Sequence, residues 1–330
     1  TKKLTTLDGR ETAPLEVKPD HFLDNKGKPL TFFEAVVGGK SVGVPGTPAL
    51  LEKAHQKWGK KKWEELFKDA IQLAEKGFPV SQKLSSSIKK NRKSLKKYKT
   101  TQNYFLPLGK GLEYGNMKTN ADYANTLKLF SRYGSDVFYS GTIGEDIIST
   151  VRNVKVNPGK LSKIDLLNYE VKERNPVCSL YRKYKVCGMG PPSSGAITIN
   201  QILGIVERYD LSKLGYNNSE TWRIIGDASR LAFADRGKYI ADSDFVDVPI
   251  DKLIDKKYLK FRSNKLETKM KIPDIKPGSI LQRETNSYIY ANSLELPSTT
   301  HISIVDKYGN ALSMTSTIES SFGSRLMTNG

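Results

Sequence analysis

The feature that most constrains the fold is an alternation of polar and apolar residues on both sides of a turn, over residues 299–317. The turn sequence DKYG begins at Asp306, and an Asp at the first position with a Gly at the fourth favours a type I turn. A three-residue loop whose last residue is a left-handed glycine is a common hairpin connection, and here it pairs Asp306 with Asn310. The apolar face then pairs Ile304 with Leu312 and Ile302 with Met314. A shift of one residue would mix the two faces, so the pattern predicts a β-hairpin in one register.

The polar face of this hairpin holds two threonines, because the same register places Thr299 opposite Thr317. Cross-strand Cβ atoms lie about 5 Å apart, so the two hydroxyls would be neighbours. A Thr–Thr cross-strand pair is commonly structural. A chemical role needs a free α-amino group on Thr299, whose pKa of about 7.7–8.0 suits it as a general base for its own hydroxyl. That role requires cleavage of the Ser298–Thr299 bond, which the pattern alone does not show.

A second hairpin contains both cysteines, in the sequence CSLYRKYKVC. A turn at residues 182–183 would place Cys178 directly opposite Cys187, close enough for a disulfide after a small adjustment. A disulfide would indicate an oxidising compartment, and two free thiols in paired strands is the open alternative. Because there are only two thiols and no nearby histidine, we predict no zinc site.

The rest of the sequence predicts many helices before the late strands. Helical spacing covers much of residues 43–78 and recurs at 120–133, 144–151, 161–169, after GPPSSG at 190–195, and at 219–239. Ser162 with Asp165 forms a capping signature, and Thr47 is a candidate cap before Pro48. In the last of these helices, Trp222 is expected to face inward together with Ala228. The order of elements predicts mixed α and β layers.

Charge and hydropathy narrow the classes of partner. The net charge of +18 over 330 residues allows polyanions as partners. The one dense basic run, residues 87–99, has helical character and no recognised nucleic-acid motif accompanies it, so no specific nucleic acid is predicted. No run of about 18 apolar residues predicts a membrane-spanning helix, and the first residues do not resemble a signal peptide.

Five segments, in order, resemble the γ-glutamyltranspeptidase family of N-terminal-nucleophile hydrolases. They are LDGRETAP, GVPGTPA, PPSSGAITINQIL, DASRLAFADRGKYIADSDFVDVP and TTHISIVDKYGNALSMTSTIESSFGS. The resemblance covers essentially the whole chain. It implies an α+β fold with four layers, αββα, here incomplete at both ends.

The resemblance also implies a proenzyme that cuts itself between Ser298 and Thr299. Residues 1–298 would be the large-subunit portion and residues 299–330 the start of the small subunit, within one intertwined domain. Thr299 would then form an acyl-enzyme from glutathione or a related γ-glutamyl amide, which water, an amino acid or a peptide would resolve. No metal or organic cofactor is implied.

Other roles follow from the family position by position. Arg10 corresponds to the arginine that grips the substrate's α-carboxylate, which a guanidinium binds with two hydrogen bonds. Thr317 corresponds to the threonine whose hydroxyl bonds and assists the nucleophile. His301 has no general-base role in the family, and Ser193 and Ser194 are expected to form a turn and a helix cap. Asp227, Arg230, Asp235 and Arg236 are expected to form a structural polar network on one helix.

Two departures from the family pattern define the alternatives. Glu319 stands where well-studied transpeptidases usually have asparagine, so a carboxylate would meet the substrate and repel its α-carboxylate. This favours, as one alternative, an acylase for another amide, like cephalosporin acylases or a poly-γ-glutamate-processing enzyme. The family's oxyanion-binding residues are expected beyond Gly330. Together with the charge, this gives an alternative of another class, an inactive basic polyanion-binding protein.

The family also suggests where the protein works. Its mature members are usually periplasmic or extracellular, and a Cys178–Cys187 disulfide would agree with such a place. We therefore expect a periplasmic or extracellular protein.

Overall fold

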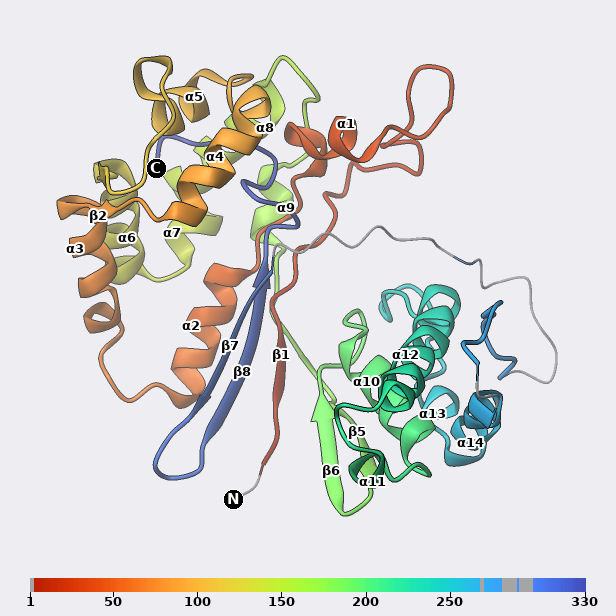
Figure 1. Ribbon diagram of the computed structural model, residues 1–330. Coiled ribbons are helices and arrows are strands. Elements are labelled where there is room, and N and C mark those ends of the chain that lie inside the picture. The colour runs from red at the N-terminus through yellow and green to blue at the C-terminus, as the bar shows by residue number, and fades with distance from the viewer. Residues whose placement is uncertain (1–2, 268–269, 281–289, 291–298) are drawn as a thin grey trace. The chain divides into compact units, whose positions relative to one another are not determined.

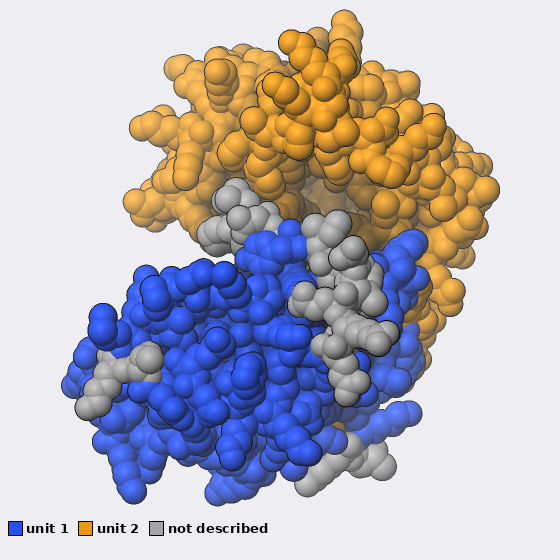
Figure 2. Space-filling view, turned by 90° about the vertical axis from the view of Figure 1, so that its right-hand side faces the viewer, with its two compact units in different colours: residues 1–7, 173–295 blue, residues 8–172, 296–330 orange. Residues whose placement is uncertain are grey.

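The structure is a computed structural model that describes residues 3–267, 270–280, 290 and 299–330. The chain divides into two compact units (Figure 2). Unit 1 consists of residues 1–7 and 173–295, and unit 2 consists of residues 8–172 and 296–330. Each of the five clusters of buried apolar side chains lies within one unit, so each unit has cores of its own.

Unit 2 is mostly helical and includes a long hairpin, β7 and β8, near its C-terminal end in the sequence (Figure 1). Its α-helices are α1 (Phe32–Val36), α2 (Thr47–Trp58), α3 (Lys68–Lys76), α4 (Gln82–Leu95), α5 (Lys99–Phe105), α6 (Ala121–Tyr133), α7 (Asp136–Tyr139), α8 (Thr142–Asn153) and α9 (Lys163–Leu167). Short 3₁₀ helices are η1 (Gly39–Ser41), η2 (Trp63–Phe67) and η3 (Pro107–Gly109). Its strands are β2 (Phe78–Pro79) with β3 (Met117–Lys118), and β7 (Thr299–Val305) with β8 (Ala311–Thr317).

Local signals explain where several of these helices begin. The predicted capping box at α9 is confirmed, since Ser162 N donates to Asp165 Oδ2 at 2.8 Å and Asp165 N donates back to Ser162 Oγ at 3.4 Å. The expected cap of α2 is wrong by one residue: Gly46 is the N-cap and Thr47 is already helical. Pro48 occupies the start of this helix, where its missing N–H costs nothing.

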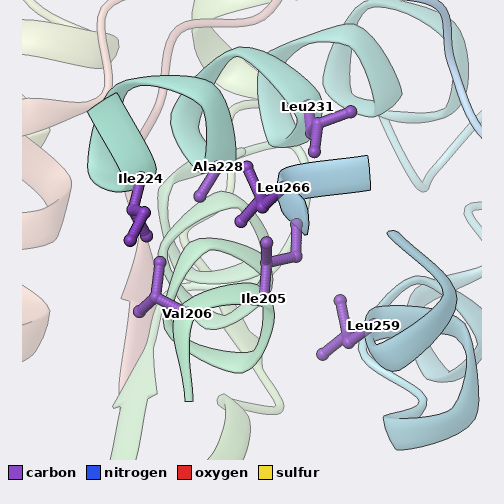
Figure 3. Close-up of a cluster of buried hydrophobic side chains, with 7 residues drawn as sticks. All are labelled: Ile205, Val206, Ile224, Ala228, Leu231, Leu259 and Leu266. Atoms are coloured by element: carbon purple, nitrogen blue, oxygen red, sulfur yellow. The ribbon is translucent and has the colours of Figure 1, made fainter. Parts of the chain in front are cut away.

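Unit 1 is built around two helices that pack together, α10 and α12. Its elements are β5 (Val177–Tyr181), β6 (Tyr184–Gly188), α10 (Gly195–Val206), α11 (Leu211–Leu214), α12 (Ser219–Tyr239), α13 (Ile250–Leu253), α14 (Lys256–Asn264) and η4 (Lys265–Glu267). Figure 3 shows its largest buried cluster, formed by Ile205, Val206, Ile224, Ala228, Leu231, Leu259 and Leu266. Strands β1 (Thr6–Asp8) and β4 (Lys172–Arg174) also pair, and the boundary between the units falls within both.

Helix α12 has the bounds that the sequence predicts, but one of its expected core residues is wrong. Trp222 is 61% exposed, and its Nε1 donates to the carbonyl of Tyr216 at 2.8 Å. The buried face of α12 is instead set by Ile224, Ala228 and Leu231, at helical spacing. Trp222 precedes Ile224 by two residues and so points away from that face.

A buried ion pair joins α12 to α14. Arg262 Nη2 lies 2.9 Å from Asp235 Oδ1, and both side chains are almost fully buried. Burial raises the pKa of Asp235, and the guanidinium of Arg262 opposes that rise. The polar network was expected along one helix, but only some of its ion pairs lie within α12. Arg230 pairs with Asp227 at 2.8 Å on α12, whereas Asp235 pairs across to another helix.

The architecture is α+β, as the sequence predicts. The strands of the described ranges form four two-stranded sheets. Among the same residues, no helix is both long enough and apolar enough to cross a bilayer.

Candidate active site

The hairpin of β7 and β8 has the predicted register at every position tested. Thr299 pairs with Thr317, His301 with Thr315, Ile302 with Met314, Ser303 with Ser313, and Ile304 with Leu312. At the turn, Asp306 N donates to Asn310 O at 3.0 Å, and Gly309 has a φ of 82°. The left-handed region suits glycine because it has no Cβ.

The open end of the hairpin brings three candidate residues together. Thr299 Oγ1 lies 3.4 Å from Thr317 Oγ1, which also accepts the backbone N–H of Glu319 at 3.0 Å. Glu319 has a φ of 65°, so the chain turns sharply just after β8. Thr317 is therefore the shared acceptor between the candidate nucleophile and this turn. Ser298, the other residue of the expected cleavage site, lies outside the described residues.

His301 is turned toward hydroxyls of its own hairpin. Its Nδ1 lies 2.7 Å from Thr315 Oγ1, and its Nε2 lies 3.2 Å from both Ser303 Oγ and Ser313 Oγ. These four side chains thus form one hydrogen-bonded group on the polar face. Within the described part of the chain, none of these bonds reaches Thr299, which leaves Thr317 as the side chain that contacts its hydroxyl.

Arg10 belongs to the same unit, and its backbone is held on both sides. Its N–H donates to Asp8 Oδ1 at 2.9 Å, and its carbonyl accepts the hydroxyl of Tyr169 at 2.8 Å. Its guanidinium is about half exposed and lies 3.8 Å from the carboxylate of Glu11. No hydrogen bond or ion pair between described residues joins Arg10 to Thr299. The guanidinium of Arg10 is partly exposed, and its partner among these residues is the carboxylate of Glu11.

A tyrosine pair that the sequence analysis missed supports Arg10. The rings of Tyr139 and Tyr169 are stacked, with centroids 5.6 Å apart and planes 7° apart. Tyr139 donates to the carbonyl of Pro45 at 2.6 Å, and Tyr169 donates to that of Arg10. Each hydroxyl therefore fixes a backbone carbonyl group. Burial raises the pKa of Tyr139 to about 12 and raises that of Tyr169 further, which keeps both hydroxyls protonated as donors. Gly46 lies against Tyr169 and the carbonyl of Gly9, and a Cβ there would collide with both.

Arg325 fixes the segment that follows the hairpin, and it too was missed. Its side chain is only 2% exposed, and its Nη1 donates to Ser320 Oγ at 2.7 Å and to the carbonyl of Gly323. Nη2 lies 3.3 Å from Asn91 Oδ1 on α4, and the carbonyl of Arg325 accepts Thr101 Oγ1 at 2.6 Å. The guanidinium thus binds neutral oxygens, and burial lowers its pKa. These contacts anchor the turn containing Glu319 to the helices of unit 2.

The sequence offers a local indication of Arg325 but none of the tyrosine pair. Arg325 follows a strand in the glycine- and serine-containing sequence SSFGSR, where a buried cation could be suspected. The stack of Tyr139 on Tyr169 has no local signal, because it joins residues 30 positions apart through the packing of α7 beside α9.

The cysteines lie in unit 1 and are joined to each other. Cys178 pairs with Cys187 across β5 and β6, and their sulfurs are bonded at 2.14 Å. The turn falls at residues 182–183, as expected from the sequence. Within the described ranges, no group of three or more His, Cys, Asp or Glu side chains could hold a metal ion.

Comparisons with known proteins identify the family of this chain. The profile of the Gamma-glutamyltranspeptidase family matches residues 1–330. The chain is 34% identical to a glutathione hydrolase proenzyme of Bacillus subtilis, over 99% of this chain and 56% of that protein. It is 33% identical to the acylase ACY 1 proenzyme of a Pseudomonas species, over 97% of this chain and 54% of that protein.

Solved structures show the same relationship. The γ-glutamyltranspeptidase of Helicobacter pylori matches with a TM-score of 0.80 and 38% identity, covering 86% of this chain and 80% of that one. The chain spans about half the length of the curated relatives it matches. Because the family profile matches every residue, the chain belongs to the γ-glutamyltranspeptidase family.

Proposed function

We propose that this chain is the nucleophile-bearing part of a γ-glutamyltransferase or γ-glutamyl hydrolase made as a proenzyme. The observation that carries the proposal is the placement of Thr299 opposite Thr317, with their hydroxyls 3.4 Å apart, in a chain that the family matches throughout.

The first step proposed is self-cleavage. Thr299 Oγ1 attacks the carbonyl carbon of Ser298, and the peptide bond rearranges to an ester on Thr299. Water then hydrolyses the ester, which leaves a carboxylate on Ser298 and a free α-amino group on Thr299. Residues 1–298 and 299–330 thereby come to belong to the large and small subunits.

The second step uses the same oxygen on the substrate. The α-amino group of Thr299 takes the proton of Oγ1, which attacks the carbonyl carbon of the γ-glutamyl amide. The amine leaves with a proton, and a γ-glutamyl ester remains on Thr299. Water releases glutamate from this ester, or an acceptor amine of an amino acid or peptide forms a new amide. The hydroxyl of Thr317, fixed by Glu319 N at 3.0 Å, orients Oγ1 for both steps.

Arg10 and Glu319 are the proposed substrate contacts. The exposed guanidinium of Arg10 suits the α-carboxylate of the glutamyl group. Glu319 lies in the turn two residues after the end of β8, and its carboxylate suits the α-ammonium group. A glutathione-like substrate is supported by the name of the Bacillus subtilis relative.

Substitution of Thr299 tests the proposal. The parent protein should yield two fragments by intact mass spectrometry, with a new N-terminus at Thr299, and should release the aniline from a γ-glutamyl anilide. Thr299→Ala should abolish both, because it removes the attacking oxygen, whereas Thr299→Ser should retain both at reduced rates. Thr300→Ala is the matched control, since it changes the neighbouring threonine. An intact Ser298–Thr299 bond in the folded parent protein would overturn the proposal.

A second candidate function is an acylase that acts on another amide. It is favoured by Glu319 in place of the family's usual asparagine and by the 33% identity to the acylase ACY 1 proenzyme. Glutaryl and γ-glutamyl anilides differ by the α-ammonium group alone, so their relative kcat/KM values decide between the two. Preference for the glutaryl compound would favour the acylase.

The place of action is proposed to be periplasmic or extracellular. The support is the bond between Cys178 and Cys187, because disulfides persist in oxidising compartments. Alkylation of the protein taken from its native cells, before any reducing agent is added, should leave both cysteines unmodified.

A further inference from the structure

A cavity of about 290 Å³ lies in unit 1 between β5, α10 and α14. One wall is the face of α10 that carries Asn200 and Gly204, and the opposite wall is the face of α14 that carries Lys256, Leu259 and Lys260. Ser179 of β5 closes a third side. The volume is close to the lower end of the range for small-molecule sites, so the cavity suits a small ligand.

One residue in the wall of the cavity carries a buried hydrogen-bond donor that no described residue accepts. Asn200 is only 1% exposed, and its Oδ1 accepts the hydroxyl of Ser179 at 2.8 Å. Its Nδ2 is buried and has no partner among the residues the structure describes. Buried polar atoms normally have partners, so an unpaired amide nitrogen in a cavity wall points to an acceptor supplied from outside the chain.

The rim of the cavity carries positive charge that is free to act on a ligand. Lys256 and Lys260 are exposed, lie one turn apart on α14, and form no ion pair in the described ranges. Of the other charges in the lining, Arg208 pairs with Glu267 at 2.9 Å. The carboxylate of Glu207, which accepts the backbone N–H of Arg182 at 2.6 Å, keeps its charge but faces two lysines. The net field at the rim therefore favours an anion.

The middle of the cavity is apolar and closely supported. Leu180, Ile254 and Leu259 line it, and Leu259 belongs to the main buried cluster of the unit (Figure 3). Gly204 lies so close to Leu259 that an added Cβ would collide with its side chain. The two helices are therefore in direct contact here, which fixes the spacing of the two walls.

We propose that this cavity is a binding site for a small organic anion with an apolar body. The anionic group would lie at the rim beside Lys256 and Lys260, the body would pack on Leu259, and an acceptor at the far end would take the free N–H of Asn200. The site is separate in its residues from the threonine hairpin, and its occupation does not depend on the function proposed above.

Three matched probes test the site by titration, followed by protein NMR. The first, 4-acetylbenzoate, has a carboxylate, a ring and a carbonyl acceptor. The second, 4-isopropylbenzoate, lacks the acceptor, and the third, 4-acetylbenzamide, lacks the charge. We expect saturable binding in the order first, second and third, with the first binding about fivefold more tightly than the second, as for one neutral hydrogen bond.

Variants assign the two ends of the site. Asn200→Ala should weaken the binding of 4-acetylbenzoate about fivefold and leave the binding of 4-isopropylbenzoate unchanged. The double change Lys256→Gln and Lys260→Gln should weaken the binding of both carboxylate probes about two- to fivefold and leave the binding of 4-acetylbenzamide unchanged. Lys257→Gln is the control, because it removes a lysine of α14 that does not line the cavity. The lysine variants change exposed positions, so they remain informative if Asn200→Ala does not fold.

Clear results would overturn the proposal. One is the absence of saturable binding by any probe, with water as the only occupant of the cavity. Another is binding of 4-acetylbenzoate that neither the Asn200 change nor the lysine changes weaken, because the probe would then bind elsewhere. Equal binding of the charged and the neutral probes would show that the rim does not select an anion.

Discussion

At the scale of single residues, Thr317 is the centre of the candidate site. Its hydroxyl oxygen accepts Glu319 N at 3.0 Å and lies 3.4 Å from Thr299 Oγ1. One oxygen therefore connects the candidate nucleophile to the turn that holds a candidate substrate contact. A change at this position should affect both neighbours, whereas a change one pair further along the hairpin should affect neither.

Replacement of Thr317 tests this connection. Thr317→Val keeps the shape and β-branching of the side chain but removes the acceptor, so the oxygen of Thr299 would lose its orientation. We expect self-cleavage and turnover to slow about five- to tenfold, as for the loss of one or two neutral hydrogen bonds. Quantitative mass spectrometry of the fragments measures the rate of self-cleavage, and release of the aniline from a γ-glutamyl anilide measures the rate of turnover. Thr315→Val, which alters the partner of His301, is the control and should leave both rates near those of the parent. An unchanged rate in Thr317→Val would show that the pair is only structural.

At the scale of elements, the sequence predicts the hairpin better than any other part of the site. Alternation with period two and a turn that needs a left-handed glycine together permit one register, so the pairing of Thr299 with Thr317 follows from local rules. The hydrogen bonds of Arg325 could not be predicted in this way, since the one to Asn91 joins residues 234 positions apart. The prediction that Trp222 is buried was wrong for a related reason. Helical spacing allows either of two faces of the helix to be the buried one, and the element that packs against the helix decides which it is.

The loop of the hairpin should make its stability depend on pH. Asp306 accepts the N–H groups of Tyr308 and Asn310 at 2.9 and 2.8 Å, and the side-chain amide of Asn310 also donates to it. These hydrogen bonds, led by that of the Asn310 side chain, lower the pKa of Asp306. The stabilisation is therefore present above the unfolded-state pKa of about 3.9 and is lost as the pH falls through the lower folded-state value.

Amide hydrogen exchange measures this effect. Protection of the N–H groups of Gly309 and Asn310 should fall on acidification below about pH 4 in the parent protein. In Asp306→Asn the protection should be lower at neutral pH and should no longer change over that range. A parent hairpin with constant protection down to the lowest pH would contradict the role given to Asp306.

The packing of Gly46 against Tyr169 makes a second prediction for an element. Gly46 has ordinary backbone angles, φ −114° and ψ −20°, so an alanine there is excluded by contacts and not by conformation. Its Cβ would meet the carbonyl of Gly9, which cannot move away as a side chain would. Gly46→Ala should lower the free energy of unfolding by about 1–3 kcal/mol and displace Arg10, raising the KM for a γ-glutamyl anilide.

Thermal and denaturant unfolding test the stability part. Gly226→Ala is the matched control, because it lies within α12 with open space around the new Cβ and should add about 0.5–1 kcal/mol. Equal effects of the two substitutions would show that the contact at Gly46 is not restrictive.

At the scale of the whole molecule, the two units have separate cores, and the disulfide belongs to one of them. The bond joins residues nine positions apart, and closing so short a loop stabilises by about 2–3 kcal/mol in the chain-entropy account. Reduction, or the pair Cys178→Ser and Cys187→Ser, should therefore lower amide protection in residues 173–267. Protection in residues 32–169 should stay the same, and an equal loss in both ranges would show that the units do not respond independently.

The hairpin of β7 and β8 also has a consequence for handling the protein. Ile302, Ile304 and Leu312 on its apolar face are about half exposed, and among the described strands each of the two has one edge without a neighbour. Such a ribbon is a template on which a strand of another molecule can add. Concentrated solutions should thus tend to form cross-β aggregates seeded at this ribbon, and the threonine pair would be lost inside them. Activity per mole would then fall as the concentration rises, even though every molecule keeps its own fold.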